Sequence, residues 1–189
     1  MILRRRCRIL QQVPVGDAVS RLLAWPAAAT EADWERLYKE QLPRVYNFFR
    51  YRLGRTADVE DLTAVTFEKA WRARHRYRRD LASFATWLLT IARHVAIDHL
   101  RQRRAEVPLD AAASMASPAR TPEQVTGLRS DVGRLSVLLS RLPDREREIL
   151  ALKYGSEMTN RDIARIAGLS ESNVGTILHR TLQELRQEW

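Results

Sequence analysis

The chain has 189 residues, of which 45% are hydrophobic and 32 are Lys or Arg against 23 Asp or Glu, giving a formal net charge of +9. This length is enough for one domain or two small ones. The basic excess favours a polyanionic partner such as nucleic acid, although basic proteins also bind acidic proteins and membranes. The single cysteine, Cys7, excludes an internal disulfide, and no apolar run approaches the about 20 residues that span a bilayer, so we expect a cytoplasmic protein.

The first helical signal lies in residues 31–53, where apolar side chains recur at helical spacing. Residues 30–33 form a candidate capping box before it, and Gly54 is placed to end it. Pro43 should kink or divide this helix because proline lacks the backbone N–H that a helix interior needs. We expect residues 1–30, which precede the helix, to be a disordered N-terminal extension.

Two further helices are expected in the first half of the chain, one over residues 57–74, capped by Thr56, and one over residues 83–103. Each carries an apolar stripe on one side, and no strand-like alternation is visible in the sequence. We therefore interpret residues 31–104 as a helical domain.

Residues 105–126 change character, because small residues and prolines replace any helical period. A structureless run of about 20 residues does not belong inside a compact domain, so we interpret it as a flexible linker. A second domain follows over residues 127–189, with a break at Leu142 and Pro143 and a helix over residues 145–154. The predicted fold class is all-α, with two small helical domains joined by that linker.

The end of the second domain has the pattern of a helix-turn-helix over residues 160–174. Ala164 is small where two helices must touch, Gly168 suits a turn with positive φ, and Val174 lies where the second helix packs back on the first. We expect the second helix, residues 171–187, to enter the major groove of DNA.

Three more blocks accompany this motif: DVEDLTAVTFEKAW at residues 58–71, FATWLLTIARHVAIDHLR at 84–101 and LPDREREIL at 142–150. In order and spacing the chain resembles the extracytoplasmic-function (ECF) sigma factors of bacterial RNA polymerase, group 4 of the sigma-70 family. The resemblance covers residues 34–104 and 127–187. It implies that the first domain is sigma region 2, which binds the −10 promoter element, and that the second is region 4, which binds the −35 element.

The resemblance also implies the partners of the chain. They are core RNA polymerase, through its β′ clamp helices and β flap, promoter DNA, and an anti-sigma factor that could hold the protein at the membrane. No catalytic residue, cofactor or small-molecule substrate is expected, because nucleotidyl transfer belongs to the polymerase. No metal site is expected either, since the four histidines and Cys7 lack the spacing of zinc ligands.

The predicted polymerase-binding residues lie in the second helix. Carboxylates in a first helical turn interact favourably with the helix dipole, which alone could explain Asp58. The resemblance implies instead that this helix docks on the β′ clamp helices, while Leu62 and Phe67 could equally be core residues. The predicted set is Asp58, Glu60, Asp61, Leu62 and Phe67.

The predicted −10 contacts lie in the loop before the third helix and on that helix. An Arg-rich loop is usually only solvated, but the resemblance implies that it captures an unstacked base, which aromatic and Arg planes can stack at about 1–3 kcal/mol per base. Where the family often has Gly and small polar residues in the loop, this chain has Arg78 and Arg79, and it has His94 where Asn is common. The predicted set is Arg76, Tyr77, Arg78, Arg93, His94 and Arg101.

The predicted −35 contacts lie on the recognition helix. Family members often carry basic residues at the positions of Gly175 and Ile177, so we expect fewer direct base contacts here and more shape readout. Arg180 matches the family's most persistent basic position, and a phosphate is its expected partner. The predicted set is Ser172, Asn173, Gly175, Thr176, His179 and Arg180.

Two other classes of function are weighed against this one. A stand-alone helix-turn-helix regulator would bind an operator without polymerase. A site-specific recombinase would need a nucleophilic Ser or Tyr among catalytic arginines. Tyr51 and Tyr77 lie near Arg residues, but neither belongs to a recombinase-like signature.

Overall fold

The computed structural model describes residues 31–54, 56–106 and 129–189, in which every regular element is a helix. The all-α prediction is therefore confirmed for these ranges. The expected N-terminal extension, the candidate capping residue Thr30 and nearly all of the expected linker lie outside them. None of the described helices combines the length and apolarity that crossing a membrane requires.

Helix α2 (Glu31–Leu53) is the first element and runs without a break through Pro43. The expected division at Pro43 is therefore wrong. Packing explains why the helix continues, because the turns after the proline bury a block of apolar side chains whose contribution exceeds the local penalty. These side chains are Val45, Phe48 and Phe49. Gly54 ends the helix as expected, with φ +84° and its N–H donating to the carbonyl of Arg50 at 3.0 Å.

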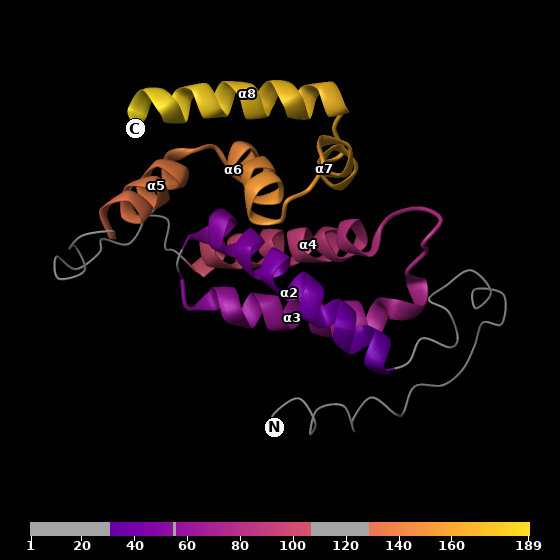
Figure 1. Ribbon diagram of the computed structural model, residues 1–189. Helices are drawn as coiled ribbons and strands as arrows, with labels where there is room; N and C mark the ends of the chain where they lie inside the picture. The colour runs from indigo at the N-terminus through magenta and orange to yellow at the C-terminus, as the bar shows by residue number, and fades with distance from the viewer. Residues whose placement is uncertain (1–30, 55, 107–128) are drawn as a thin grey trace.

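Helices α3 (Asp58–Ala73) and α4 (Phe84–Glu106) complete a three-helix bundle with α2, which we call the N-terminal bundle (Figure 1). The expected cap at Thr56 is wrong, because Ala57 holds the N-cap position and the Thr56 hydroxyl is buried without a partner. The apolar sides of both helices are buried as predicted. Their buried residues include Val59, Thr66, Phe67, Ala70, Leu88, Ala92 and Val95.

The C-terminal unit consists of α5 (Arg129–Arg141), α6 (Asp144–Leu150), the π-helical turn η5 (Ala151–Gly155), α7 (Asn160–Ala167) and α8 (Glu171–Glu188). The predicted break between α5 and α6 is confirmed at Leu142 and Pro143. The helix that was expected over residues 145–154 is present, but its last turn widens into η5.

The helix-turn-helix is formed by α7 and α8, as predicted. Gly168 adopts the left-handed conformation with φ +68°, which only glycine tolerates readily. Each helix begins at a hydroxyl cap: Thr159 accepts from the N–H of Asp162, and Ser170 accepts from the N–H of Asn173, both at 3.2 Å.

The N-terminal bundle and the C-terminal unit pack against each other, which the sequence did not predict. In Figure 1, α6 and α7 lie between α8 and the bundle, and η5 contacts α2. The Ser156 hydroxyl donates to the backbone carbonyl of Arg44 at 3.0 Å, and Gly155 lies directly against the backbone of Asn47. One buried apolar cluster spans both parts.

Candidate nucleic-acid interface

The recognition helix α8 presents a polar face at its N-terminal half. Val174 and Leu178 are buried against the rest of the unit, which leaves the predicted −35 residues on the opposite side. Of that set, Gly175 is half-buried and the remaining residues are exposed: Ser172, Asn173, Thr176, His179 and Arg180. The structure therefore gathers the whole predicted set on one accessible helix face.

Arg180 is the cation of this face, and a neighbouring helix holds it in place. Its Nη2 donates to Oε1 of Glu146 on α6 at 2.6 Å, and its Nε lies 3.8 Å from Oε1 of Glu184. Arg180 keeps 60% of its side chain exposed while that of Glu146 is 12% exposed, so the acid is fixed and the guanidinium still faces solvent. Such an arrangement can hold a phosphate or a base edge.

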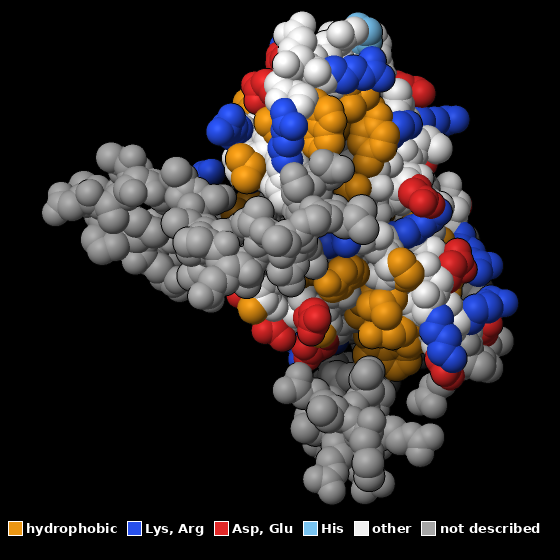
Figure 2. Space-filling model, turned by 60° about the vertical axis from the view of Figure 1, so that its left-hand side comes forward, with side chains coloured by type: hydrophobic (Ala, Val, Ile, Leu, Met, Phe, Trp, Pro, Cys, Tyr) orange, Lys and Arg blue, Asp and Glu red, His pale blue; other side chains and the backbone are white. Residues whose placement is uncertain are grey.

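The predicted −10 residues of α4 divide into two groups. His94 and Arg101 are exposed and open to solvent. Arg93 is not: its Nε donates to Oε1 of Glu148 on α6 at 2.7 Å, across the contact between the two parts of the chain. Figure 2 shows Lys and Arg side chains distributed along one side of the described surface, with acidic side chains between them.

The loop between α3 and α4 carries the other predicted −10 residues. Arg76 and Arg78 are exposed, and Arg78 forms two hydrogen bonds to Asp80, at 3.1 and 2.6 Å, which lower the pKa of that carboxyl. Tyr77 differs from expectation because it is only 4% exposed. Its hydroxyl donates to the carbonyl of Ala82 at 3.3 Å, and burial raises its pKa.

An aromatic cluster explains why the Tyr77 side chain is buried. Its ring lies 5.5 Å from that of Phe84, nearly perpendicular to it, and 5.2 Å from that of Trp87. The edge-to-face contact with Phe84 is of a kind worth about 0.5–1.5 kcal/mol beyond the buried area. In this structure the Tyr77 side chain packs beneath the loop surface and hydrogen-bonds to the loop backbone, so no face of its ring is accessible to a base.

The acidic start of α3 forms the predicted polymerase-binding surface. Glu60 and Asp61 are exposed, and Leu62 is half-buried. Asp58 is also half-buried, with Oδ2 3.6 Å from Nε2 of His99. The core alternative for Phe67 is the one that the structure shows, because Phe67 is 5% exposed and its ring lies 4.5 Å from that of Tyr38.

Sequence reasoning missed a group of charged residues between the bundle and the C-terminal unit. Both carboxylate oxygens of Asp144 lie 3.0 Å from side-chain nitrogens of Arg52, and this interaction lowers the pKa of Asp144. Nη2 of Arg104 lies 3.7 Å from Oδ2 of the same carboxylate. Beside them, burial lowers the pKa of Arg147, whose Nη2 donates to the carbonyls of Ser140 and Leu142. The only signal in the sequence was two acids four residues apart, at Asp144 and Glu148.

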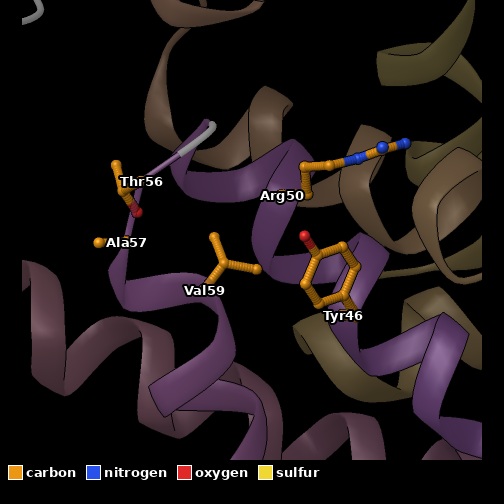
Figure 3. A pocket seen from close by; sticks show the side chains of 5 residues that line it. All are labelled: Tyr46, Arg50, Thr56, Ala57 and Val59. Carbon is orange, nitrogen blue, oxygen red and sulfur yellow. The ribbon is translucent and has the colours of Figure 1, made fainter.

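Two shallow hollows lie on the described surface. The larger, about 310 Å³, lies between the end of α2 and the start of α3 and is drawn in Figure 3. There the guanidinium of Arg50 points away from Thr56, so no charged group converges on the space. The second, about 200 Å³, is lined by Arg101, Arg104 and Asp144 with two apolar residues. In the described ranges no three His, Cys, Asp or Glu side chains come together to hold a metal ion.

Known families match both parts of the chain. Residues 37–106 match the family described as Sigma-70 region 2, and residues 138–187 match Sigma-70, region 4. The ECF RNA polymerase sigma factor SigM of Bacillus subtilis is 30% identical over 80% of this chain and 92% of its own length. The ECF RNA polymerase sigma factor BldN of Streptomyces coelicolor is also 30% identical, over 84% of this chain and 61% of that protein.

A solved structure shares the arrangement of helices. It is the sigma factor RpoE of Bartonella quintana, crystallised in complex with the anti-sigma factor NepR. The two chains superimpose with a TM-score of 0.69 and 25% sequence identity, over 82% of this chain and 96% of that one.

Proposed function

Because the chain belongs to the extracytoplasmic-function sigma factors of the sigma-70 family, we propose that it binds core RNA polymerase in the cytoplasm and directs transcription from promoters with −10 and −35 elements. In this proposal the N-terminal bundle acts as region 2 and the C-terminal unit as region 4. Within the family, initiation depends on binding to the polymerase and to promoter DNA. The chain itself supplies recognition, and the polymerase supplies the chemistry.

The observation that carries the proposal is the exposed polar face of α8 on an intact helix-turn-helix, with Arg180 fixed by Glu146. Residues near the N-terminus of a recognition helix reach base edges in the major groove. Asn173 can read adenine through two hydrogen bonds, and Arg180 can bind a phosphate. We assign −35 recognition to this face, with Ser172, Gly175, Thr176 and His179 beside them.

For the −10 element we propose the loop before α4 together with the exposed side of α4. Arg76, Arg78, His94 and Arg101 are exposed there and suit the backbone of a melting strand. Arg93 belongs to the same side of α4 but is paired with Glu148. Tyr77 is withdrawn from the set of direct contacts because its ring is packed into the aromatic cluster.

For the polymerase we propose the acidic start of α3, with Glu60 and Asp61 as its exposed charges and Asp58 and Leu62 at its edge. Acidic residues in so basic a chain suit a basic partner surface, here the β′ clamp helices. The C-terminal unit would contact the β flap. An anti-sigma factor is a further proposed partner, by analogy with the complex of RpoE and NepR, and it could hold the chain at the membrane.

Run-off transcription tests the proposal. The full chain is added to core polymerase on a genomic promoter library, and the 5′ ends of the transcripts are mapped. We expect start sites that share upstream elements at −10 and −35, and we expect none without the chain. Specific binding to an operator in the absence of polymerase, with no transcripts in its presence, would favour the stand-alone regulator instead.

A further inference from the structure

Gly175 leaves a gap between the side chains on the polar face of α8, and a residue of the preceding helix lies beside that gap. A Cβ added at Gly175 would lie 3.9 Å from Nδ2 of Asn160, the first residue of α7. Asn160 is half-buried, so part of its side chain stays in contact with solvent there. The surface to which we assign −35 recognition therefore includes a side chain that the recognition helix does not supply.

Lys153 of η5 determines which way the Asn160 amide faces. Its Nζ donates to Oδ1 of Asn160 at 2.9 Å. A lysine ammonium has only donors, so the atom that faces it must be the amide oxygen, and the NH2 group must face away from it. That NH2 group lies towards Gly175, and no acceptor pairs with it in the described part of the chain. Its N–H groups are therefore free to donate at the edge of the α8 face.

Lys153 also carries a charge that no described carboxylate balances, since its hydrogen bond to Asn160 is a bond to a neutral group. The arginines of the same region differ, because Arg52, Arg93 and Arg180 are each paired with an acid. Lys153 is half-buried, and removing part of the water around a cation costs free energy that an anion can offset. Its surroundings thus favour an anionic ligand.

A phosphate of the DNA backbone fits both groups. Lysine ammonium groups and the amide groups of asparagine are common phosphate contacts. The ammonium of Lys153 and the NH2 group of Asn160 adjoin one another, because the ammonium is bonded to the oxygen of the same amide, so a single phosphate can bridge them. Both residues precede the recognition helix, and the segments beside such a helix meet the backbone while the helix itself enters the groove.

We propose that Lys153 and Asn160 together bind one backbone phosphate beside the −35 element, and we call this pair the phosphate clamp. The inference rests on the proposed function, because it takes the C-terminal unit as the part that binds −35 DNA. The clamp adds a cation from η5 to the contacts of α8. Since phosphate contacts fix the position of a protein on the duplex and carry no sequence information, the clamp orients α8 in the groove and leaves the base preference to α8 itself.

Lys153→Met in the full chain tests the cation of the clamp, because it removes the charge and keeps the length of the side chain. Loss of one phosphate contact should lower the slope of log K against log salt by about 0.9 and raise the dissociation constant about fivefold at physiological salt. The matched control Lys39→Met removes the same formal charge from α2, where Nζ lies 2.8 Å from Oε1 of Glu35. It should change neither quantity.

Asn160→Asp tests the amide and separates binding from a structural role. The variant has nearly the same shape and keeps an oxygen for Lys153, but it replaces the NH2 group with an oxygen that repels phosphate. DNA binding should weaken at least as much as in Lys153→Met. The Tm should not fall, because the bond to Lys153 becomes an ion pair and an acid in the first turn of α7 interacts favourably with the helix dipole. If the pair only held η5 and α7 together, this variant would bind DNA like the wild type.

Neutral methylphosphonate linkages then identify the phosphate. The probe is a fluorescein-labelled duplex that carries the −35 element of a promoter mapped by run-off transcription, with one backbone phosphate replaced at a time. Fluorescence anisotropy measures the dissociation constant for each duplex. We expect one position at which the replacement weakens binding of the wild-type chain and leaves binding of Lys153→Met unchanged.

The results distinguish the clamp from the proposed function. Wild-type salt slopes in Lys153→Met and Asn160→Asp, or methylphosphonate losses that are the same for the wild type and Lys153→Met at every position, would overturn the clamp. Start sites mapped with the wild-type chain would still support the function in that case. If the wild-type chain directs no transcription from any promoter, the function itself is overturned, and the clamp with it.

Discussion

Glu146 on α6 and Arg180 on α8 are joined by a hydrogen-bonded ion pair of 2.6 Å, which ties the recognition helix to the helix beside it. The acid is nearly buried and the base is exposed, so the pair orients the guanidinium without hiding it. The two acids that flank Glu146 at two residues' distance, Asp144 and Glu148, face the N-terminal bundle instead. One short helix thus holds the proposed DNA-binding arginine, Arg180, on one side and contacts the N-terminal bundle on the other.

Arg180→Ala should weaken binding to the −35 element and flatten its salt dependence. Each neutralised phosphate contributes about 0.9 to the slope of log K against log salt, so the slope should fall by about one unit. Binding of the full chain to a −35 duplex, titrated from low to high salt, measures this. Arg186→Ala, an exposed arginine in the last turn of α8, is the matched control. An unchanged slope for Arg180→Ala would argue against a phosphate contact there.

Asp61→Arg should weaken binding to core RNA polymerase and leave the fold intact. Asp61 is exposed on the first turns of α3, so a reversed charge meets the partner surface without disturbing the core. Affinity is measured by fluorescence titration of labelled chain with core enzyme, and helicity by circular dichroism. Glu68→Arg reverses an exposed acid further along the same helix and should have the smaller effect. Equal losses for the two variants would count against a specific surface at the helix start.

Local signals in the sequence were sufficient to predict the helices and most of the boundaries between them. Gly168 predicted the turn of the helix-turn-helix because a positive φ favours glycine, and Leu142–Pro143 predicted a helix boundary because proline restricts the residue before it. Pro43 shows where such reasoning fails: the penalty is local, but the burial that outweighs it depends on contacts with other helices. Thr56 fails because α3 begins one residue later than expected, with Ala57 at the N-cap position and no side-chain cap.

Long-range pairing was beyond the sequence pattern. Arg52 and Asp144 are 92 residues apart, and each alone resembles an ordinary surface charge. The burial of Tyr77 was equally hidden, because an aromatic residue at a helix edge can pack inward or face a partner. For Phe67 the sequence left both alternatives open, and the structure shows the core one. The polar face of α8 was easier to predict, since its residues are the polar positions of a single amphipathic helix whose apolar side is buried. The contacts of the predicted site residues with DNA and with polymerase stay predictions.

Gly168→Ala should lower the stability of the chain by about 1 kcal/mol, because an L-residue pays about that cost in the left-handed conformation. No atom lies within 4 Å of the added Cβ, so the effect is one of the backbone alone. Gly175→Ala is the matched control, since it replaces a glycine inside helix α8 where an added Cβ would meet only the Asn160 side chain, at an ordinary contact distance of 3.9 Å, and it should raise stability by about 0.5–1 kcal/mol. Thermal unfolding followed by circular dichroism distinguishes the two signs. A stabilised Gly168→Ala variant would contradict the assigned turn.

Acid should open the contact between the two parts before it unfolds the helices. The hydrogen bonds from Arg52 lower the pKa of Asp144 while the two parts are in contact, and Arg104 adds to the effect. A carboxyl whose folded pKa is depressed contributes its stabilisation above the unfolded value, about 3.9, and loses it as the pH falls through the folded pKa. The distance between the two parts is measured by double electron–electron resonance between spin labels at Ala64→Cys on α3 and Gln183→Cys on α8, both exposed positions, in a chain that also carries Cys7→Ser. This distance should therefore lengthen over that acidic range while helicity is retained. Asp144→Asn cannot titrate, so its distance distribution should already be longer at neutral pH and should change less on acidification. A wild-type distance that stays constant until the helices melt would show that Asp144 does not stabilise the contact between the two parts.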